Sequence, residues 1–137
     1  DIDHFKSVND TFGHAVGDDA IRFVAGVVSE GTRGYDIVCR YGGEEFCVLL
    51  PGAALDVAAQ VSERIRKSVM EQSLVNLPQL QGRGLTISLG IALFDGSMGQ
   101  PMELVNRADE ALYSSKTSGR NRTSICDPKH SATQAVA

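Results

Sequence analysis

Two glycines followed at once by two carboxylates stand in residues 40–46, Arg-Tyr-Gly-Gly-Glu-Glu-Phe. Strand-like runs flank this segment, residues 35–40 before it and 46–50 after it. The glycines are therefore expected to supply the positive φ angles of a tight hairpin turn. Adjacent carboxylates at a hairpin tip repel each other unless they meet a cation or a polar ligand. Glu44 and Glu45 are thus candidates for a metal site, with a solvated turn as the alternative.

A second pair of carboxylates, Asp1 and Asp3, opens the chain. Alternate residues of a strand lie on one face, so both side chains are expected on the same side. Carboxylates at a strand end, helped by a backbone carbonyl, can hold Mg²⁺, although a solvated loop would explain this pair taken alone. Together the two acidic clusters predict a metal cradle of the kind used in phosphoryl transfer, where metal ions neutralise charge on the attacking and leaving oxygens.

The composition is that of one soluble globular domain of 137 residues with a net charge of −4. This charge disfavours nonspecific binding to nucleic acid or to an acidic membrane, and no apolar run is long enough to span a bilayer. The chain opens inside a motif that looks catalytic, without Met or a signal peptide, which indicates a fragment of a longer protein.

The three cysteines show no metal-ligand spacing. If Gly42 and Gly43 form a two-residue turn, Cys39 lies opposite Phe46. Cys39 and Cys47 then point to opposite faces of the hairpin and cannot form a disulfide. A reducing, cytoplasmic setting fits this pattern.

The remaining elements follow from apolar spacing and from breaker residues. We expect an α+β fold of ferredoxin or polymerase-palm type, with a central antiparallel sheet and flanking helices. The domain is expected over residues 1–126, followed by a flexible tail over 127–137. The expected elements are helices over 6–12, 17–31, 57–69 and 101–119, a hairpin over 35–51 that is covered on both faces, and strands over 85–94 and 122–126.

Several separated motifs now identify a family, because they occur in register along most of the chain. The sequence resembles the GGDEF domain, the catalytic domain of bacterial diguanylate cyclases, in its Gly-Gly-Glu-Glu-Phe form. The resemblance runs from Asp1 to about Arg122. It is carried by residues 1–6, 8–10, 12–14, 17–18, 40–46, 86–90, 108–113, 116 and 119–121.

The resemblance implies a reaction in which two GTP molecules are joined into cyclic di-GMP with loss of two pyrophosphates. Two subunits face each other as a homodimer, and each presents one GTP. Two Mg²⁺ ions per site are implied, with Mn²⁺ as an alternative metal. By resemblance, Asp1 binds metal through its carboxylate and Ile2 through its backbone carbonyl. Glu44 is a further ligand and the base on the 3′-hydroxyl, Glu45 assists at the metals, and Gly43 leaves room for the nucleotide.

The same resemblance assigns the groups that hold the substrate. Asn9 and Asp18 match the guanine-binding pair, since an Asp accepts from the guanine N–H edge and an Asn both donates and accepts. Taken alone, Asp18 would be read as a helix cap and Asn9 as a turn residue. His14 lies near the substrate in this comparison. Phosphate-binding bases correspond to Lys6, Lys116 and Arg120, each of which taken alone would be a solvated surface charge.

An Arg-x-x-Asp pair, Arg33 and Asp36, stands at the spacing of the family's inhibitory product site. There the pair would bind cyclic di-GMP, with the Arg on phosphate and guanine and the Asp on the guanine edge. Arg64 matches an additional arginine from a neighbouring subunit or domain. An ordinary surface ion pair, which contributes little, is the alternative.

The chain also departs from the family pattern. The family domain begins a few tens of residues earlier, with a helix bearing an Asp-x-Leu-Thr signature and a strand that leads into Asp1. Their absence is expected to leave a central sheet edge exposed. We therefore expect an active full-length cyclase and a fragment with little or no activity.

Two other functions stay open at this point. One is a non-catalytic sensor of GTP or cyclic di-GMP, and the other is a related cyclase of mixed purine specificity. The expected location is cytoplasmic, including the cytoplasmic domain of a membrane-anchored sensor. No nucleic-acid partner and no direct membrane contact are expected.

Overall fold

The computed structural model of the protein describes residues 1–96, 98–126 and 134–135. Four helices and two small sheets confirm the expected α+β class. In chain order the elements are α1 (Phe5–Phe12), α2 (His14–Glu30), β1 (Ile37–Arg40), β2 (Phe46–Leu49), α3 (Leu55–Asn76), the short 3₁₀ helix η1 (Pro78–Leu80), β3 (Leu89–Ala92), α4 (Pro101–Thr117), β4 (Thr123–Cys126) and β5 (Gln134–Ala135).

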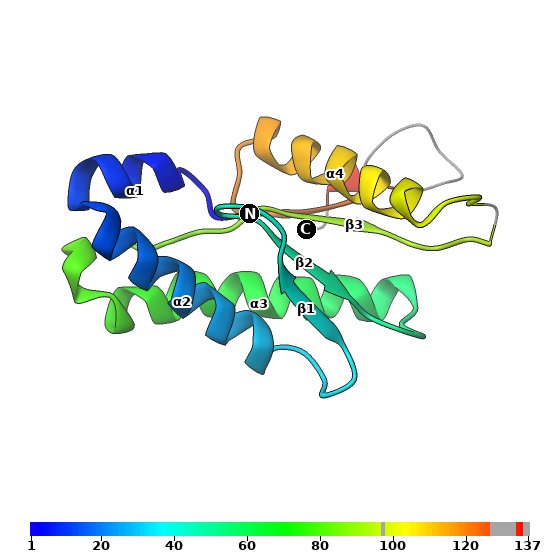
Figure 1. Ribbon diagram of the computed structural model, residues 1–137, viewed down its shortest axis with the longest axis horizontal. Coiled ribbons are helices and arrows are strands. Elements are labelled where there is room, and N and C mark those ends of the chain that lie inside the picture. Colours follow the sequence, from blue (N-terminus) through cyan, green and yellow to red (C-terminus); the bar gives the residue numbers. More distant parts are fainter. Residues whose placement is uncertain (97, 127–133, 136–137) are drawn as a thin grey trace.

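The strands form two sheets that are not hydrogen-bonded to each other. β1 and β2 make an antiparallel hairpin, whereas β3 and β4 are parallel, with β5 antiparallel to β4. The connection from β3 to β4 runs through α4, as a parallel pair requires. Both α3 and α4 contact the β3–β4 sheet, and α2 runs alongside α3 (Figure 1). No helix in the described ranges is both long and apolar enough to cross a membrane.

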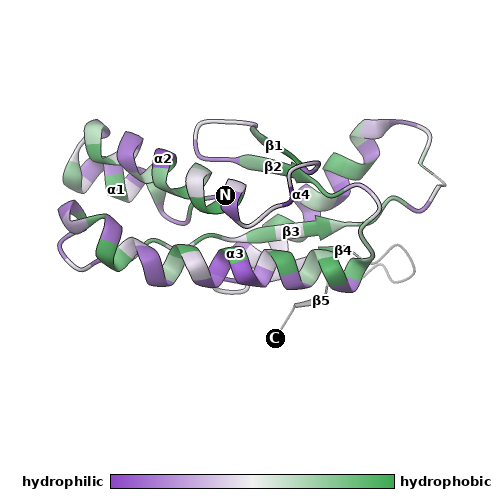
Figure 2. Ribbon diagram, turned by 90° about the horizontal axis from the view of Figure 1, so that it is seen from below, coloured by the Kyte–Doolittle hydropathy of each residue, from purple (hydrophilic) through white to green (hydrophobic). Residues whose placement is uncertain are grey.

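The main core lies between α1, α2, α3 and the segment before β3. The apolar residues recur at helical spacing on α2 and α3, and this recurrence buries one stripe of each helix. Figure 2 shows the resulting alternation of hydrophobic and hydrophilic residues along α3, and the largely hydrophobic strands behind it. The buried members of these two stripes are Ala20, Ile21, Val24, Val27 and Val28 on α2, and Ala58, Val61, Ile65 and Val69 on α3.

Several expected elements have different limits in the structure. The helix expected over 57–69 is α3, which spans Leu55–Asn76. α2 begins at His14 rather than at Gly17, because the chain turns at Gly13 with a φ of 87°. The expected strand over 85–94 shortens to Leu89–Ala92, because residues 86–88 pair with the chain start instead of β4. Most of the expected tail lies outside the described residues, but Gln134–Ala135 pairs with β4 and does not form part of a free tail.

The prediction of a two-residue hairpin turn is wrong. Residues 41–45 close the hairpin, with the Tyr41 and Gly42 N–H groups both donating to the Glu45 carbonyl, at 2.8 and 3.2 Å. Neither glycine of the loop has a positive φ. A five-residue loop does not need the left-handed conformations that a two-residue turn imposes.

The longer loop shifts the strand register by one residue. Cys39 is therefore the direct partner of Cys47, and Arg40 that of Phe46. The expectation that the two cysteines face apart is also wrong. Nor is the hairpin covered on both faces, because Ile37 and Leu49 are 55% and 43% exposed.

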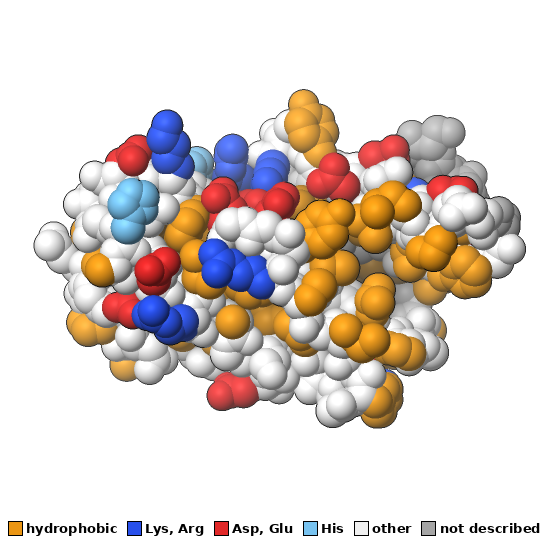
Figure 3. All heavy atoms as spheres, viewed as in Figure 1, with side chains coloured by type: hydrophobic (Ala, Val, Ile, Leu, Met, Phe, Trp, Pro, Cys, Tyr) orange, Lys and Arg blue, Asp and Glu red, His pale blue; other side chains and the backbone are white. Residues whose placement is uncertain are grey.

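A groove of about 830 Å³ separates the two sheets. It runs between β2 and the β3 segment, with α3 and α4 contributing side chains and Asp1 at its margin. Figure 3 shows hydrophobic side chains gathered over the half of the molecule that carries β2 and α4. The groove is thus mainly apolar, and the facing edges of β2 and β3 do not pair with each other.

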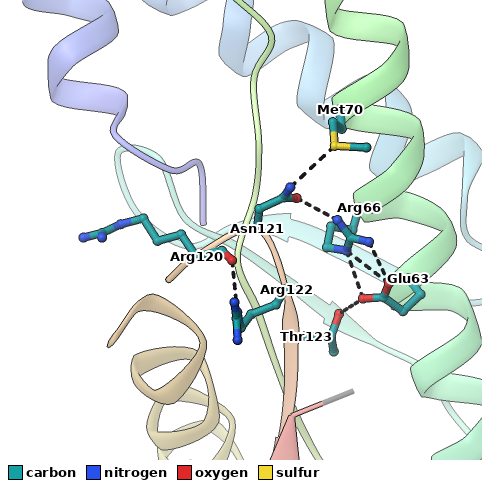
Figure 4. Close-up of polar contacts among 7 residues, drawn as sticks. All are labelled: Glu63, Arg66, Met70, Arg120, Asn121, Arg122 and Thr123. Atoms are coloured by element: carbon teal, nitrogen blue, oxygen red, sulfur yellow. Dashed lines mark hydrogen bonds and ion pairs between the residues drawn. The ribbon is translucent and has the colours of Figure 1, made fainter. Parts of the chain in front are cut away.

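A largely buried polar network ties α3 to β4 (Figure 4). The Arg66 guanidinium donates to both Glu63 carboxylate oxygens, at 2.9 to 3.1 Å, and to Asn121 Oδ1 at 2.7 Å. The Thr123 hydroxyl donates to Glu63 Oε1 at 2.7 Å. Burial raises the pKa of Glu63, but the hydrogen bonds from Arg66 and Thr123 outweigh this and leave the pKa below its ordinary value of 4.5.

Replacing Glu63 by Gln is expected to lower the free energy of unfolding at neutral pH by about 1 to 3 kcal/mol, because a largely buried Arg66 loses its carboxylate partner. A depressed carboxyl pKa contributes stability above its unfolded value that disappears as the pH falls through the folded value. The wild-type chain should therefore lose stability below about pH 4.5 more steeply than Glu63→Gln. Urea unfolding at several pH values measures both effects. Glu71→Gln, an exposed change on the same helix, is the control; equal acid slopes for Glu63→Gln and wild type would contradict the assignment.

Candidate functional site

The start of the chain lies between the hairpin loop and the segment before β3. The Ile2 N–H donates to the Glu44 carbonyl at 3.2 Å, and Ile2 forms an antiparallel bridge with Ile87. The Ser88 N–H donates to the Asp1 carbonyl at 3.0 Å. The structure thereby brings together the two acidic segments that the sequence analysis singled out, which are 43 positions apart at Asp1 and Glu44.

Asp1 makes the ion pair at the centre of this site. Its carboxylate is only 6% exposed, and Oδ2 lies 2.9 Å from the Lys116 ammonium. The α-amino group donates to the Ser88 carbonyl at 3.1 Å, and burial, followed by the Lys116 charge, lowers its pKa to about 6. The neighbouring Ser115 hydroxyl donates to the Leu89 carbonyl at 2.7 Å, which holds the end of α4 that carries Lys116 against β3.

Asp3 does not join the acidic cluster. Its buried carboxylate accepts three hydrogen bonds, from the Thr86 hydroxyl at 2.7 Å, the Ser88 hydroxyl at 2.6 Å and the Asn121 N–H at 3.0 Å. The chain turns at Asp3 and His4, where His4 has a φ of 56°, so that the strand-like segment ends at Ile2. Asp3 is a positioning residue, which connects the start of the chain to the loop after α4.

The hairpin loop is held by Arg40, an arginine of the motif to which the sequence analysis assigned no role. The Arg40 guanidinium donates to the Gly42 and Gly43 carbonyls, at 3.2 and 2.7 Å. The Glu45 carboxylate lies against Gly42 so closely that a Cβ there would collide with it, whereas the space beside Gly43 is open. The sequence feature that could have predicted this role is the position of Arg40 directly before Tyr-Gly-Gly, where its side chain can reach the carbonyl groups of the loop.

The donor set of the cluster fits a hard divalent cation. It comprises the Asp1 and Glu44 carboxylates and the Ile2 carbonyl, all oxygen ligands of the kind that Mg²⁺ prefers. The close ion pair with Lys116 shows that Asp1 already balances a positive charge here. In the described part of the chain, no three His, Cys, Asp or Glu side chains converge as a ready-made metal site. Figure 3 shows a band of acidic side chains over this region, with basic side chains on both sides.

The candidate guanine-binding residues lie on α1 and α2. The Asn9 side chain rests against Gly17, where any Cβ would collide with its amide oxygen. This close approach places Asn9 beside the turn of α2 that carries Asp18, which is exposed. His14 and Lys6 are also exposed. Arg120 has a left-handed φ of 62°, and its side chain extends away from the Glu63 network (Figure 4).

The predicted inhibitory pair forms a compact turn between α2 and β1. The Arg33 N–H donates to Asp36 Oδ2 and the Asp36 N–H donates to the Arg33 carbonyl, at 2.7 and 2.9 Å. The Arg33 guanidinium donates to the Tyr35 hydroxyl at 2.7 Å and lies 5.8 Å from that ring's centroid. Arg64 donates to the Gly31 carbonyl at 2.8 Å. The Asp36 carboxylate therefore accepts from the backbone N–H of Arg33, whereas the Arg33 guanidinium interacts with the Tyr35 side chain.

These features match one family throughout. Residues 1–122 match the model of "Diguanylate cyclase, GGDEF domain", and the chain belongs to that family. It is 44% identical to Diguanylate cyclase A of Treponema denticola over 127 residues, which is 91% of this chain and 33% of that protein.

Solved structures agree with this assignment. The GGDEF domain of DgcB from Caulobacter crescentus, in complex with c-di-GMP, superposes with a TM-score of 0.81 at 41% identity, over 92% of this chain and 74% of that chain. The active GGEEF domain of a diguanylate cyclase from Vibrio cholerae gives 0.83 at 32% identity, over 93% and 79%. The chain spans about a third of the length of the curated relatives it matches.

Proposed function

We propose that this chain is the catalytic domain of a diguanylate cyclase that joins two GTP molecules into cyclic di-GMP. The observation that carries the proposal is the hydrogen bond from Ile2 to Glu44, together with the ion pair of Asp1 with Lys116. These contacts gather acidic residues, a backbone carbonyl and the partly exposed ammonium of Lys116 at one place. Such a set suits the charge that develops when a hydroxyl attacks a phosphate.

Each phosphodiester forms through one proton transfer, one new bond to phosphorus and one broken bond to phosphorus. Glu44 accepts the proton of the 3′-hydroxyl, the 3′-oxygen bonds to the α-phosphorus of the facing GTP, and the bond from that phosphorus to the bridging oxygen breaks to release pyrophosphate. A homodimer presents the two GTP molecules to each other. Mg²⁺, or Mn²⁺ in its place, would be held by Asp1, Ile2, Glu44 and Glu45, and would raise the acidity of the hydroxyl and neutralise phosphate charge.

The remaining proposed contacts orient the nucleotide. Asn9 and Asp18 read the guanine edge, which offers two N–H donors that adenine lacks. The open space at Gly43 admits the nucleotide beside the loop. The basic groups that receive the phosphates are Lys6, Lys116 and Arg120, with His14 near the substrate.

The test is to incubate the chain with GTP and Mg²⁺ and to identify the products by mass. Cyclic di-GMP and pyrophosphate in a ratio of one to two would support the proposal, and replacing GTP by ATP should abolish the product. Tight binding of cyclic di-GMP without any turnover, by the chain alone and by the chain fused to the preceding segment as described below, would favour a non-catalytic sensor.

The 137 residues alone are predicted to turn over GTP slowly. Asp1 lines the mainly apolar groove between β2 and β3, whose facing edges do not pair with each other, so a strand seated in the groove would give the site further backbone support. Fusing the segment that precedes the corresponding Asp in the Vibrio cholerae domain should fill the groove and raise the rate at least tenfold. A fusion that folds yet shows the unextended rate would contradict this prediction.

We also propose product inhibition through Arg33, Asp36 and Arg64. The compact turn supports this idea because it leaves the exposed Arg33 guanidinium, stacked near Tyr35, available for a phosphate and a guanine face.

Arg33→Ala is expected to raise the concentration of cyclic di-GMP needed for half inhibition at least tenfold while leaving the initial rate unchanged, because the site lies apart from residues 1–3 and 41–45. Initial rates measured against added product test this. Arg22→Ala, which removes an exposed arginine of α2, is the matched control. Equal inhibition of both variants would exclude the site.

A further inference from the structure

Two cysteines face each other at the base of the hairpin loop. Cys39 on β1 is the direct antiparallel partner of Cys47 on β2, one position before the Arg40–Phe46 pair that leads into the loop. Burial, followed by the influence of the neighbouring Cys39 side chain, raises the pKa of the Cys47 thiol, as expected for two thiols that lie close together. Their face of the hairpin is the one that carries the exposed Ile37 and Leu49, since these residues are two positions away on each strand.

The register suits a covalent bond between the two sulfurs. Directly opposite residues of an antiparallel pair have Cα atoms about 4.5 or 5.5 Å apart. Both values fall within the range of about 4.4 to 6.8 Å that disulfides span. The Cβ atoms of such pairs lie about 4.5 to 5.5 Å apart, whereas a disulfide prefers about 3.5 to 4.5 Å, so the strands must draw together slightly. The resulting strain makes a bond of this kind reducible rather than permanent.

The pair is also accessible, because Cys39 is exposed and Cys47 is half-buried. The third cysteine, Cys126, lies on β4 in the other sheet, where its strand partner is Ala92, and it does not take part in the pairing of β1 with β2.

We propose that Cys39 and Cys47 are a reversible redox modification site, whose disulfide slows turnover at the adjacent loop. The oxidant is a hydroperoxide. It transfers one oxygen atom to the exposed Cys39 thiol, giving a sulfenic acid and an alcohol, or water when the oxidant is hydrogen peroxide. The Cys47 sulfur then attacks the Cys39 sulfur, the S–O bond breaks, and the second proton leaves with the hydroxyl as water. A dithiol reductant reverses the bond by exchange.

The effect on the site follows from the neighbouring contacts. Drawing the strands together at this pair moves Arg40, whose guanidinium holds the Gly42 and Gly43 carbonyls. The loop also carries Glu44, whose carbonyl accepts from Ile2. The effect on turnover rests on the proposed cyclase function, but formation of the disulfide does not.

The experiment treats the reduced chain with hydrogen peroxide and follows it by intact mass, peptide mapping and GTP turnover. We expect the mass to fall by two hydrogen atoms, a mapped link from Cys39 to Cys47 within one chain, and at least a tenfold loss of turnover that dithiothreitol restores. Cys126→Ser should behave like the wild type, whereas Cys47→Ser should neither form the link nor lose turnover reversibly.

Each other outcome decides a separate part of the proposal. A chain that forms only intermolecular links, or none, overturns the modification site. A mapped link with unchanged turnover overturns its regulatory effect. If the oxidised chain shows the mapped link but the reduced chain makes no cyclic di-GMP, the modification site stands, and the cyclase proposal is overturned only when the reduced fusion with the preceding segment makes none either.

Discussion

Glu44→Gln is expected to lower the rate of cyclic di-GMP formation at least about 10³-fold, which corresponds to roughly 4 kcal/mol of transition-state stabilisation. The change keeps the size of the side chain and removes the oxygen charge that accepts the 3′-hydroxyl proton. General-base catalysis alone contributes about 10²- to 10⁴-fold, and loss of a metal ligand adds to it. Because Glu44 meets Ile2 through its backbone carbonyl, the fold should survive the substitution.

The measurement is the initial rate of product formation, determined by mass with GTP and Mg²⁺ in excess. Glu71→Gln removes an exposed carboxylate from α3 and should leave the rate unchanged. GTP binding by Glu44→Gln should remain within a few-fold of the wild type, since the proposed guanine contacts lie on α1 and α2. A variant that keeps more than a tenth of the wild-type rate would exclude Glu44 as the base.

The Asp1–Glu44 juxtaposition could be anticipated, because both acidic motifs were visible and a shared cation was their simplest explanation. The hydrogen-bonding role of Asp3 could not be anticipated in this way. Its role depends on Thr86, Ser88 and Asn121, which lie more than 80 positions away and become neighbours only when the chain folds. Alternation along a strand is a local rule, and it stops where the chain turns.

The hairpin shows the same limit at shorter range. Helices α1 and α4 were predicted close to their observed limits, since apolar periodicity and breaker residues such as Pro101 mark them directly, whereas the prediction for α3 ended at residue 69 and the helix continues to Asn76. The register of β1 and β2 was predicted wrongly, because Gly42 and Gly43 suggested a turn with positive φ angles that neither residue adopts. Gly42 packs closely against the Glu45 carboxylate, and the space beside Gly43 is open. The loop is longer than a two-residue turn, and Cys39 lies directly opposite Cys47.

Gly90→Ala is expected to be the most destabilising small substitution that the structure identifies, lowering the free energy of unfolding by about 3 kcal/mol. A Cβ at Gly90 would collide with the Ala108 carbonyl oxygen and the Leu112 backbone nitrogen of α4. Backbone atoms cannot be cleared by a rotamer change, so α4 must move off β3. For a domain of this size the loss corresponds to a fall in melting temperature of about 10 °C.

Gly26→Ala provides the matched control, because Gly26 is exposed on α2 and a Cβ there meets nothing within 4 Å. That substitution should stabilise the chain by up to about 1 kcal/mol through helix propensity. Thermal and urea unfolding of both variants give the comparison, and similar effects of the two changes would contradict the packing argument. Because α4 also carries Lys116, displacing it should loosen the ion pair with Asp1. Gly90→Ala should therefore lower turnover even at temperatures where it remains folded, which links the packing of one strand glycine to the charge balance of the site.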